Sequence, residues 1–141
     1  MQKILLCMCI TLLGFTTTKA QSTTDEIINT FFQKYKISTD EAVDYVFQTN
    51  PYFAGNDGVD NVKLRINNVK PLLGDYLGEE VLSTKKLGSS YVLITYIVKY
   101  DREPLRFQFQ LYKPRDKWQL YNFKFDENVW EEFEGYEPKA P

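Results

Sequence analysis

The spacing of apolar residues changes once along this chain, close to Gly74. Before that point apolar side chains recur at intervals of three and four residues, which is typical of amphipathic helices. From Leu77 onward they alternate with polar residues, which is typical of strands. Because all the helical segments precede the strands, the sequence predicts an α+β fold in which three N-terminal helices pack on a curved antiparallel sheet of about four strands.

The first two helices have recognisable starts and stops. Residues 23–26 and 38–41 each have the spacing of a capping box, in which Thr or Ser is followed three residues later by Glu. Apolar stripes that reach Tyr35 and Phe47 follow these two starts. Pro51 stops the second helix, because the residue before a proline disfavours helical backbone. The short link between the two helices predicts neighbours that are antiparallel or sharply angled.

The third helix is expected over residues 62–73, where Val62, Ile66, Val69 and Leu73 follow at helical spacing. We expect Pro71 to kink or shorten its last turn and Gly74 to end it. An oxygen-rich stretch precedes this helix: Asn56, Asp57, Asp60 and Asn61. It lacks the ligand spacing and closing glutamate of a calcium-binding EF-hand, so we interpret it as helix capping.

Four strands are expected over residues 79–87, 91–100, 105–112 and 117–125. A two-residue loop at the second turn predicts that Tyr100 lies opposite Leu105, with Tyr96 opposite Phe109. For the last hairpin, a three-residue loop buries aromatic rings and a two-residue loop would bury charges. We therefore expect Tyr121 opposite Phe109, with these residues facing the helices: Ile94, Tyr96, Val98, Tyr100, Leu105, Phe107, Phe109, Leu111, Tyr121, Phe123 and Phe125.

The opposite face of the sheet has an apolar end and a basic end in this register. It is either a solvated face or a contact surface, and its candidate interface residues are Leu93, Tyr112, Trp118, Leu120, Lys99, Arg106 and Lys124. Like charges on neighbouring strands repel one another, so the three basic residues need an acidic partner. The C-terminal segment offers Glu131, Glu132, Glu134 and Glu137, from this chain or from a second subunit.

The N-terminus has the three parts of a secretory signal peptide. A positive start, an apolar run over residues 4–15 and small residues at Thr18 and Ala20 predict cleavage near Ala20. The run is too short to span a bilayer, and no later segment is as apolar. We therefore expect a signal peptide over residues 1–20, an α+β domain over 21–126 and an acidic tail over 127–141. The chain would be exported to the periplasm or beyond.

Signal removal limits the chemistry that remains. The two cysteines, Cys7 and Cys9, leave with the signal, and the sequence contains no histidine. Thiol nucleophiles, histidine bases and metal sites built from these residues are therefore excluded from the processed chain. Loss of Lys3 and Lys19 changes the formal net charge from −2 to −4, which disfavours nucleic acid as a partner. We expect no cofactor and no metal.

The order of these elements resembles the nuclear-transport-factor-2-like (cystatin-like α+β) superfamily, in particular small exported bacterial members of unknown function. The resemblance covers residues 24–126 and is carried by the Phe31-Phe32 helix, the third helix ending in Gly74 and the terminal strands over residues 91–125. It implies a cone open between the helices and the sheet, and often a dimer through the outer sheet face. Enzymes of the superfamily place Asp, His, Tyr or Arg inside the cone.

Three functions remain open from the sequence. A non-catalytic domain would hold a small apolar ligand in the cone against Tyr45, Tyr96, Tyr100 and Tyr121. An interaction or envelope scaffold module would act through the outer sheet face, as a homodimer or on another protein. A degenerate or unusual isomerase or hydrolase would need a carboxylate beside a tyrosine-lined pocket, with Asp44, Asp57 or Asp75 approaching its mouth. No catalytic residue is assigned from the sequence.

Overall fold

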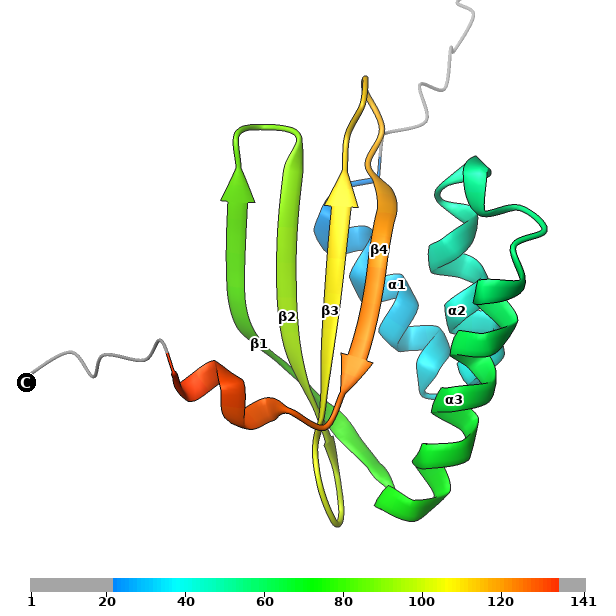
Figure 1. Ribbon diagram of the computed structural model, residues 1–141, viewed down its shortest axis with the longest axis vertical. Coiled ribbons are helices and arrows are strands. Elements are labelled where there is room, and N and C mark those ends of the chain that lie inside the picture. The colour runs from blue at the N-terminus through cyan, green and yellow to red at the C-terminus, as the bar shows by residue number, and fades with distance from the viewer. Residues whose placement is uncertain (1–21, 135–141) are drawn as a thin grey trace, which may run out of the picture.

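The computed structural model describes residues 22–134, so the signal peptide expected over residues 1–20 lies outside the described part. The elements run in the order α1 (Thr24–Tyr35), α2 (Thr39–Gln48), η1 (Pro51–Phe53), α3 (Asp57–Leu73), β1 (Tyr76–Leu87), β2 (Tyr91–Tyr100), β3 (Leu105–Tyr112), β4 (Gln119–Asp126) and η2 (Val129–Phe133). The α+β fold class is confirmed. In Figure 1, α1 crosses behind the sheet, while η2, in red, lies on the near side.

Both helix starts follow the sequence expectation. Thr23 accepts the backbone N–H of Glu26, whose carboxylate accepts the backbone N–H of Thr23 in return. At α2 only one half of this arrangement forms. Ser38 accepts the backbone N–H of Glu41 at 3.3 Å, and the return hydrogen bond to the Glu41 carboxylate is missing. These contacts satisfy N–H groups that have no partner inside a helix. Local sequence alone therefore sets where both helices begin.

The third helix is longer than expected and contains Pro71 within its last turn. It starts earlier because Asn56 caps it by accepting the Gly58 N–H at 2.8 Å, which supports the capping interpretation of this stretch. It ends at Gly74, whose φ of 87° favours glycine. A Cβ at Gly74 would lie 2.9 Å from the Cβ of Asp101 in the β2–β3 turn, so this junction also needs a residue without a side chain.

The sheet is antiparallel with strand order β1-β2-β3-β4. Tyr96 lies opposite Phe107, not opposite Phe109 as expected, so the β2–β3 register differs by two residues. The β2–β3 pairing ends at Val98 and Leu105, so the turn is longer than expected and Tyr100 pairs only with Tyr76 of β1. A shift of two residues keeps every side chain on its expected face.

The pairing of β3 with β4 contains a bulge that the sequence analysis missed. Asn122 lies opposite Gln110 and Leu120 lies opposite Leu111, so Tyr121 is the extra residue. Phe123 and Phe125 face the helices as expected, because they follow the bulge.

The faces expected for three residues before or at the bulge were wrong. Leu120 is fully buried and Trp118 packs partly buried against the core, although both were expected on the outer face. Tyr121 was expected to face inward but is 56% exposed. One additional residue reverses the direction of every side chain that precedes it in the strand, so a single bulge explains all three errors.

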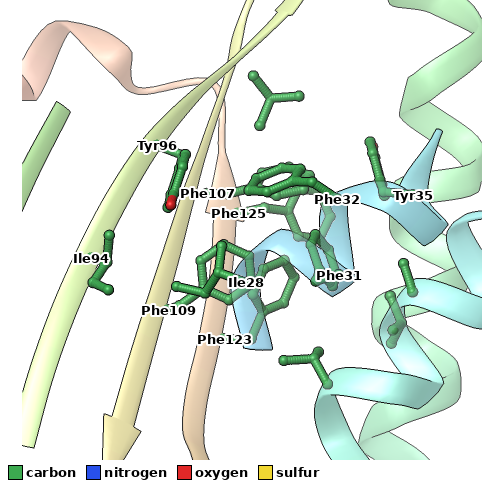
Figure 2. Packing of buried hydrophobic residues seen from close by; sticks show 14 of the residues in the cluster. Ile28, Phe31, Phe32, Tyr35, Ile94, Tyr96, Phe107, Phe109, Phe123 and Phe125 are labelled. Carbon is green, nitrogen blue, oxygen red and sulfur yellow. The ribbon is translucent and has the colours of Figure 1, made fainter. Parts of the chain in front are cut away.

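Aromatic rings fill the space between α1 and the sheet (Figure 2). The Phe31 ring centroid lies 5.0 Å from that of Phe109, and the Phe32 centroid lies 5.0 Å from that of Tyr96. Phe107 and Phe123 meet edge to face at 5.4 Å. These distances are typical of closely packed aromatic pairs, so side chains occupy this part of the expected cone.

Candidate functional site

The four tyrosines expected to line one ligand pocket lie in different environments. Tyr96 and Tyr100 are buried in the core, whereas Tyr121 is on the opposite face of the sheet. Tyr45 is half-buried on α2, where the Lys34 ammonium lies 5.9 Å from its ring centroid. The structure therefore does not bring these four residues together.

A different group of tyrosines meets at the end of the core next to the β1–β2 pairing. The hydroxyls of Tyr35 and Tyr100 are 2.5 Å apart, and the Tyr76 hydroxyl donates to the Glu79 carboxylate. Burial is the main cause that raises the pKa of Tyr35 and Tyr76, and it raises the pKa of Tyr100 to about 12. All three hydroxyls therefore stay protonated near neutral pH. Tyr76 was missed because it precedes the strand expected from the sequence.

Lys70 closes one side of this tyrosine cluster. Its ammonium lies 4.3 Å from the Tyr35 ring centroid and donates to the Tyr35 carbonyl at 3.3 Å and to the Thr39 hydroxyl at 3.4 Å. Burial lowers the pKa of Lys70. Cation–π contact and these two acceptors hold the ammonium against the core. The cluster thus fastens α1 and α3 to the end of the sheet.

The carboxylates considered from the sequence do not enter this cluster. Asp44 and Asp57 line a surface cavity of about 430 Å³ between α2 and α3, and Asp44 forms an ion pair with Lys63. Asp75 is exposed. Within residues 22–134, no three His, Cys, Asp or Glu side chains are grouped so that they could hold a metal ion.

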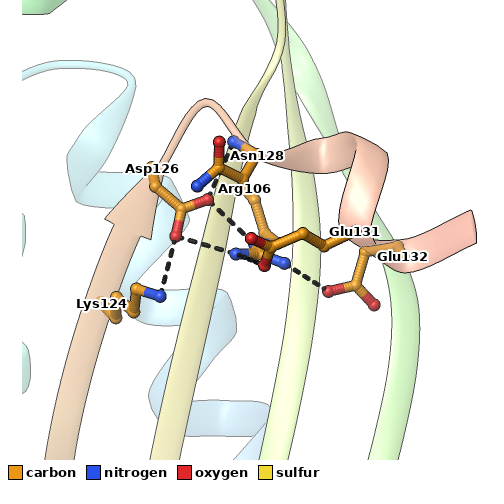
Figure 3. A network of polar contacts seen from close by, with 6 residues as sticks. All are labelled: Arg106, Lys124, Asp126, Asn128, Glu131 and Glu132. Atoms are coloured by element: carbon orange, nitrogen blue, oxygen red, sulfur yellow. Dashed lines mark hydrogen bonds and ion pairs between the residues drawn. The ribbon is translucent and has the colours of Figure 1, made fainter. Parts of the chain in front are cut away.

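Arg106 dominates one end of the outer sheet face (Figure 3). Its side chain is 3% exposed and forms a two-pronged pair with Asp126, in which both N–H···O distances are 2.9 Å. The same guanidinium donates to Glu131 at 2.8 Å and to Glu132 at 3.0 Å. Arg106 therefore ties η2 to the sheet through three carboxylates.

This network confirms that the basic end of the face has acidic partners. Glu131 and Glu132 come from the same chain, whereas Glu137 lies outside the described residues. The other two basic candidates, Lys99 and Lys124, pair with Glu80 at 2.6 Å and with Asp126 at 3.2 Å. Arg106 has the acidic partners expected for it, and they cover its side chain. Its place at an interface stays a prediction.

The pKa values within the network follow from these contacts. The hydrogen bond to Asp126 is the main cause that raises the pKa of Arg106. For Asp126, partial burial favours the neutral acid, but hydrogen bonds from Arg106, the Asn128 backbone and Lys124 outweigh it and lower the pKa. Both groups therefore remain charged near neutral pH, which keeps η2 in place.

The other end of the outer face carries three tyrosines, Tyr91, Tyr112 and Tyr121, which we call the tyrosine patch. The Tyr91 ring centroid lies 6.3 Å from that of Tyr112 and 5.7 Å from that of Tyr121. The Tyr91 hydroxyl donates to the Gln110 amide oxygen at 2.9 Å. Tyr112 is 38% exposed and Tyr121 is 56% exposed.

The part of β2, β3 and β4 beside the tyrosine patch carries no charged side chain, and Lys85 of β1 lies opposite Leu93 at its edge. Leu93, Gln110 and Asn122 form one row across the three strands beside it. Of the seven residues expected at an interface, Leu93 and Tyr112 lie in this area. Tyr121 was missed because only the bulge turns it outward, and Tyr91 was assigned to no surface. The site is therefore an area of aromatic and amide side chains on the outer face of the sheet.

No protein-family model, curated protein or solved structure matches this chain. In residues 22–134, no helix has both the length and the apolar character that crossing a membrane requires.

Proposed function

We propose that the chain is an exported, non-catalytic interaction module that binds a second copy of itself through the tyrosine patch. In this proposal the signal peptide over residues 1–20 is removed near Ala20 and the domain acts in the periplasm or outside the cell. The observation that carries the proposal is the tyrosine patch, which is exposed at one end of the outer sheet face. The other end of that face is covered by η2.

The difference in burial between the two sheet faces supports an interaction role. On the inner face, Phe107 and Phe109 are fully buried against α1, so aromatic side chains of the protein itself fill this side of the sheet. The outer face instead exposes Tyr112 and Tyr121 next to amide side chains. Tyrosine supplies a large apolar area and a hydroxyl that hydrogen-bonds, and it is enriched at protein interfaces.

A second copy of the chain is the partner that the charges favour. On β2, β3 and β4, the rows that contain Tyr112, Gln110 and Asn122 have no ionised side chain, and Lys85 lies at their β1 end. Two copies that meet through these three strands therefore bring no like charges together. A two-fold axis places the same patch on both sides of the interface, and this is the commonest arrangement of homo-oligomers. The proposed membership of the nuclear-transport-factor-2-like superfamily, whose members often pair through this face, agrees with such a dimer.

Light scattering of the purified, processed chain tests the proposal. We expect the mass of a dimer at micromolar concentration and that of a monomer for Tyr121→Asp, because two new carboxylates would face each other across the interface. Tyr52→Asp is the matched control, since Tyr52 is 87% exposed but lies on η1. A monomeric parent chain, or a Tyr121→Asp variant that remains dimeric, would contradict self-association through the tyrosine patch.

The alternative of a carboxylate–tyrosine enzyme has one observation in its favour. Glu79 accepts a hydrogen bond from Tyr76, beside the Tyr35–Tyr100 hydroxyl pair. Such a carboxylate would act as a base while the protonated hydroxyls stabilise an oxyanion. Phenolic oxyanion mimics titrated into the chain test this role. Binding that is lost in Glu79→Gln or Tyr100→Phe would support it, and no binding would exclude a phenol-accepting site of this kind.

A further inference from the structure

A pocket of about 480 Å³ lies between η2 and the outer face of β1 and β2, outside the tyrosine patch. Four apolar side chains form much of its lining, and the full set is Leu82, Ser83, Lys85, Ile97, Val129, Glu131, Glu132 and Phe133. This volume is within the range of small-molecule sites. The pocket exists because the Arg106 network holds η2 above the sheet.

A second β-bulge shapes the floor of this pocket. Val81 pairs with Tyr96 and Ser83 pairs with Thr95, so Leu82 is the extra residue in β1. The bulge places Leu82 and Ser83 together at the pocket, where each contributes to the lining.

The Ser83 hydroxyl has no partner in the pocket. In the described part of the chain, Ser83 Oγ is the one buried side-chain oxygen or nitrogen that makes no hydrogen bond. Buried hydroxyls normally have a partner, because leaving one unpaired is unfavourable. A hydroxyl both donates and accepts, so an alcohol, a carbonyl or an amide would satisfy it.

The charges around the pocket are balanced. Glu131 and Glu132 already accept hydrogen bonds from Arg106, and Lys85 contributes a positive charge to the lining. Counting Arg106, Lys124 and Lys85 against Asp126, Glu131 and Glu132 gives equal numbers of each sign. An added charge of either sign would upset this balance, so the site favours an uncharged occupant.

We propose that the pocket binds a small uncharged molecule with an aliphatic body and one alcohol or carbonyl group that hydrogen-bonds to Ser83 Oγ. Its aliphatic body contacts Leu82, Ile97, Val129 and Phe133. This site is independent of the self-association proposal, because none of its lining residues belongs to the tyrosine patch. The two proposals therefore succeed or fail separately.

Titration of the methyl-labelled, processed chain with 1-hexanol, hexanoate and hexylamine tests the site by NMR. We expect saturable shifts of the Leu82, Ile97 and Val129 methyl signals with 1-hexanol, and weaker binding of both charged analogues. Ser83→Ala should weaken 1-hexanol binding by about two- to tenfold, the range for one lost hydrogen bond. Thr84→Ala is the control, since Thr84 is exposed but does not line the pocket. It lies opposite Ile94, which faces the helices on the other side of the sheet.

Three results would overturn the inference. The first is the absence of saturable shifts at these methyl groups with 1-hexanol. The second is tighter binding of hexanoate or hexylamine, which would assign the pocket to a charged ligand held by Lys85 or by the glutamates. The third is a folded Ser83→Ala variant with unchanged affinity for 1-hexanol. The comparison of the three probes on the parent chain decides the question even where Ser83→Ala does not fold.

Discussion

The guanidinium of Arg106 is buried, so its positive charge needs acidic partners. Its side chain is almost completely buried, and Asp126, Glu131 and Glu132 surround it (Figure 3). Removing one member of a buried ion pair leaves the other charges without compensation. The cationic side chain therefore determines whether η2 stays on the sheet, and through η2 it determines whether the pocket above Ser83 exists.

Replacing Arg106 by methionine is expected to lower the free energy of unfolding by about 3 kcal/mol, because three carboxylates lose their common partner. Urea denaturation measures this change. Lys99→Met is the matched control and should cost less than about 1 kcal/mol, since Lys99 and Glu80 form an exposed pair. Equal losses in the two variants would show that the Arg106 network contributes no more than a surface ion pair.

Asp126 makes the stability of the chain sensitive to acid. The folded state lowers the pKa of this carboxyl, so its contribution is complete above the unfolded pKa of about 4. The contribution is lost as the pH falls through the lower folded pKa. We expect the free energy of unfolding to decline below about pH 4, and Asp126→Asn to be less stable at pH 7 with a flatter acid limb. An identical acid limb in both proteins would refute the assignment.

At the scale of elements, the caps of α1 and α2 were predicted from local sequence, whereas the bulges and the strand registers, which depend on pairing, were not. Thr23 and Ser38 cap their helices as expected, because each cap involves residues three positions apart. The bulge at Tyr121 was missed because nothing in β4 alone marks it. It is set from outside the strand, since Asn50 donates to the Leu120 carbonyl at 2.8 Å and Thr49 accepts the Leu120 N–H at 2.9 Å.

The bulge has a direct test in two adjacent residues. Leu120→Ala should destabilise the chain by about 3 kcal/mol, because Leu120 is fully buried. Tyr121→Ala should cost less than about 1 kcal/mol, because Tyr121 is largely exposed and loses only contacts within the tyrosine patch. Thermal and urea unfolding at low protein concentration measure both values. A larger loss for Tyr121→Ala than for Leu120→Ala would contradict the bulge. It would indicate the regular register, in which Tyr121 is buried and Leu120 is exposed.

At the scale of the whole molecule, the sheet separates a filled side from a partly open side. The fold class and the faces of β2 and β3 could be predicted, because alternation along a strand fixes which side chains point inward. The candidate site could be predicted only in part. Leu93 and Tyr112 were identified, but Tyr121 depends on the bulge and the cover over Arg106 depends on where η2 returns to the sheet.

The most direct test of self-association through the tyrosine patch is an intermolecular distance between spin labels. A chain that starts at Gln21 has no cysteine, so Asn122→Cys places one label beside the patch and Asn61→Cys places one on α3, where Asn61 is exposed. Face-to-face pairing predicts a defined distance for Asn122→Cys that is shorter than for Asn61→Cys, since α3 lies on the other side of the sheet. No intermolecular distance at either position, or a shorter one at Asn61, would contradict the proposal.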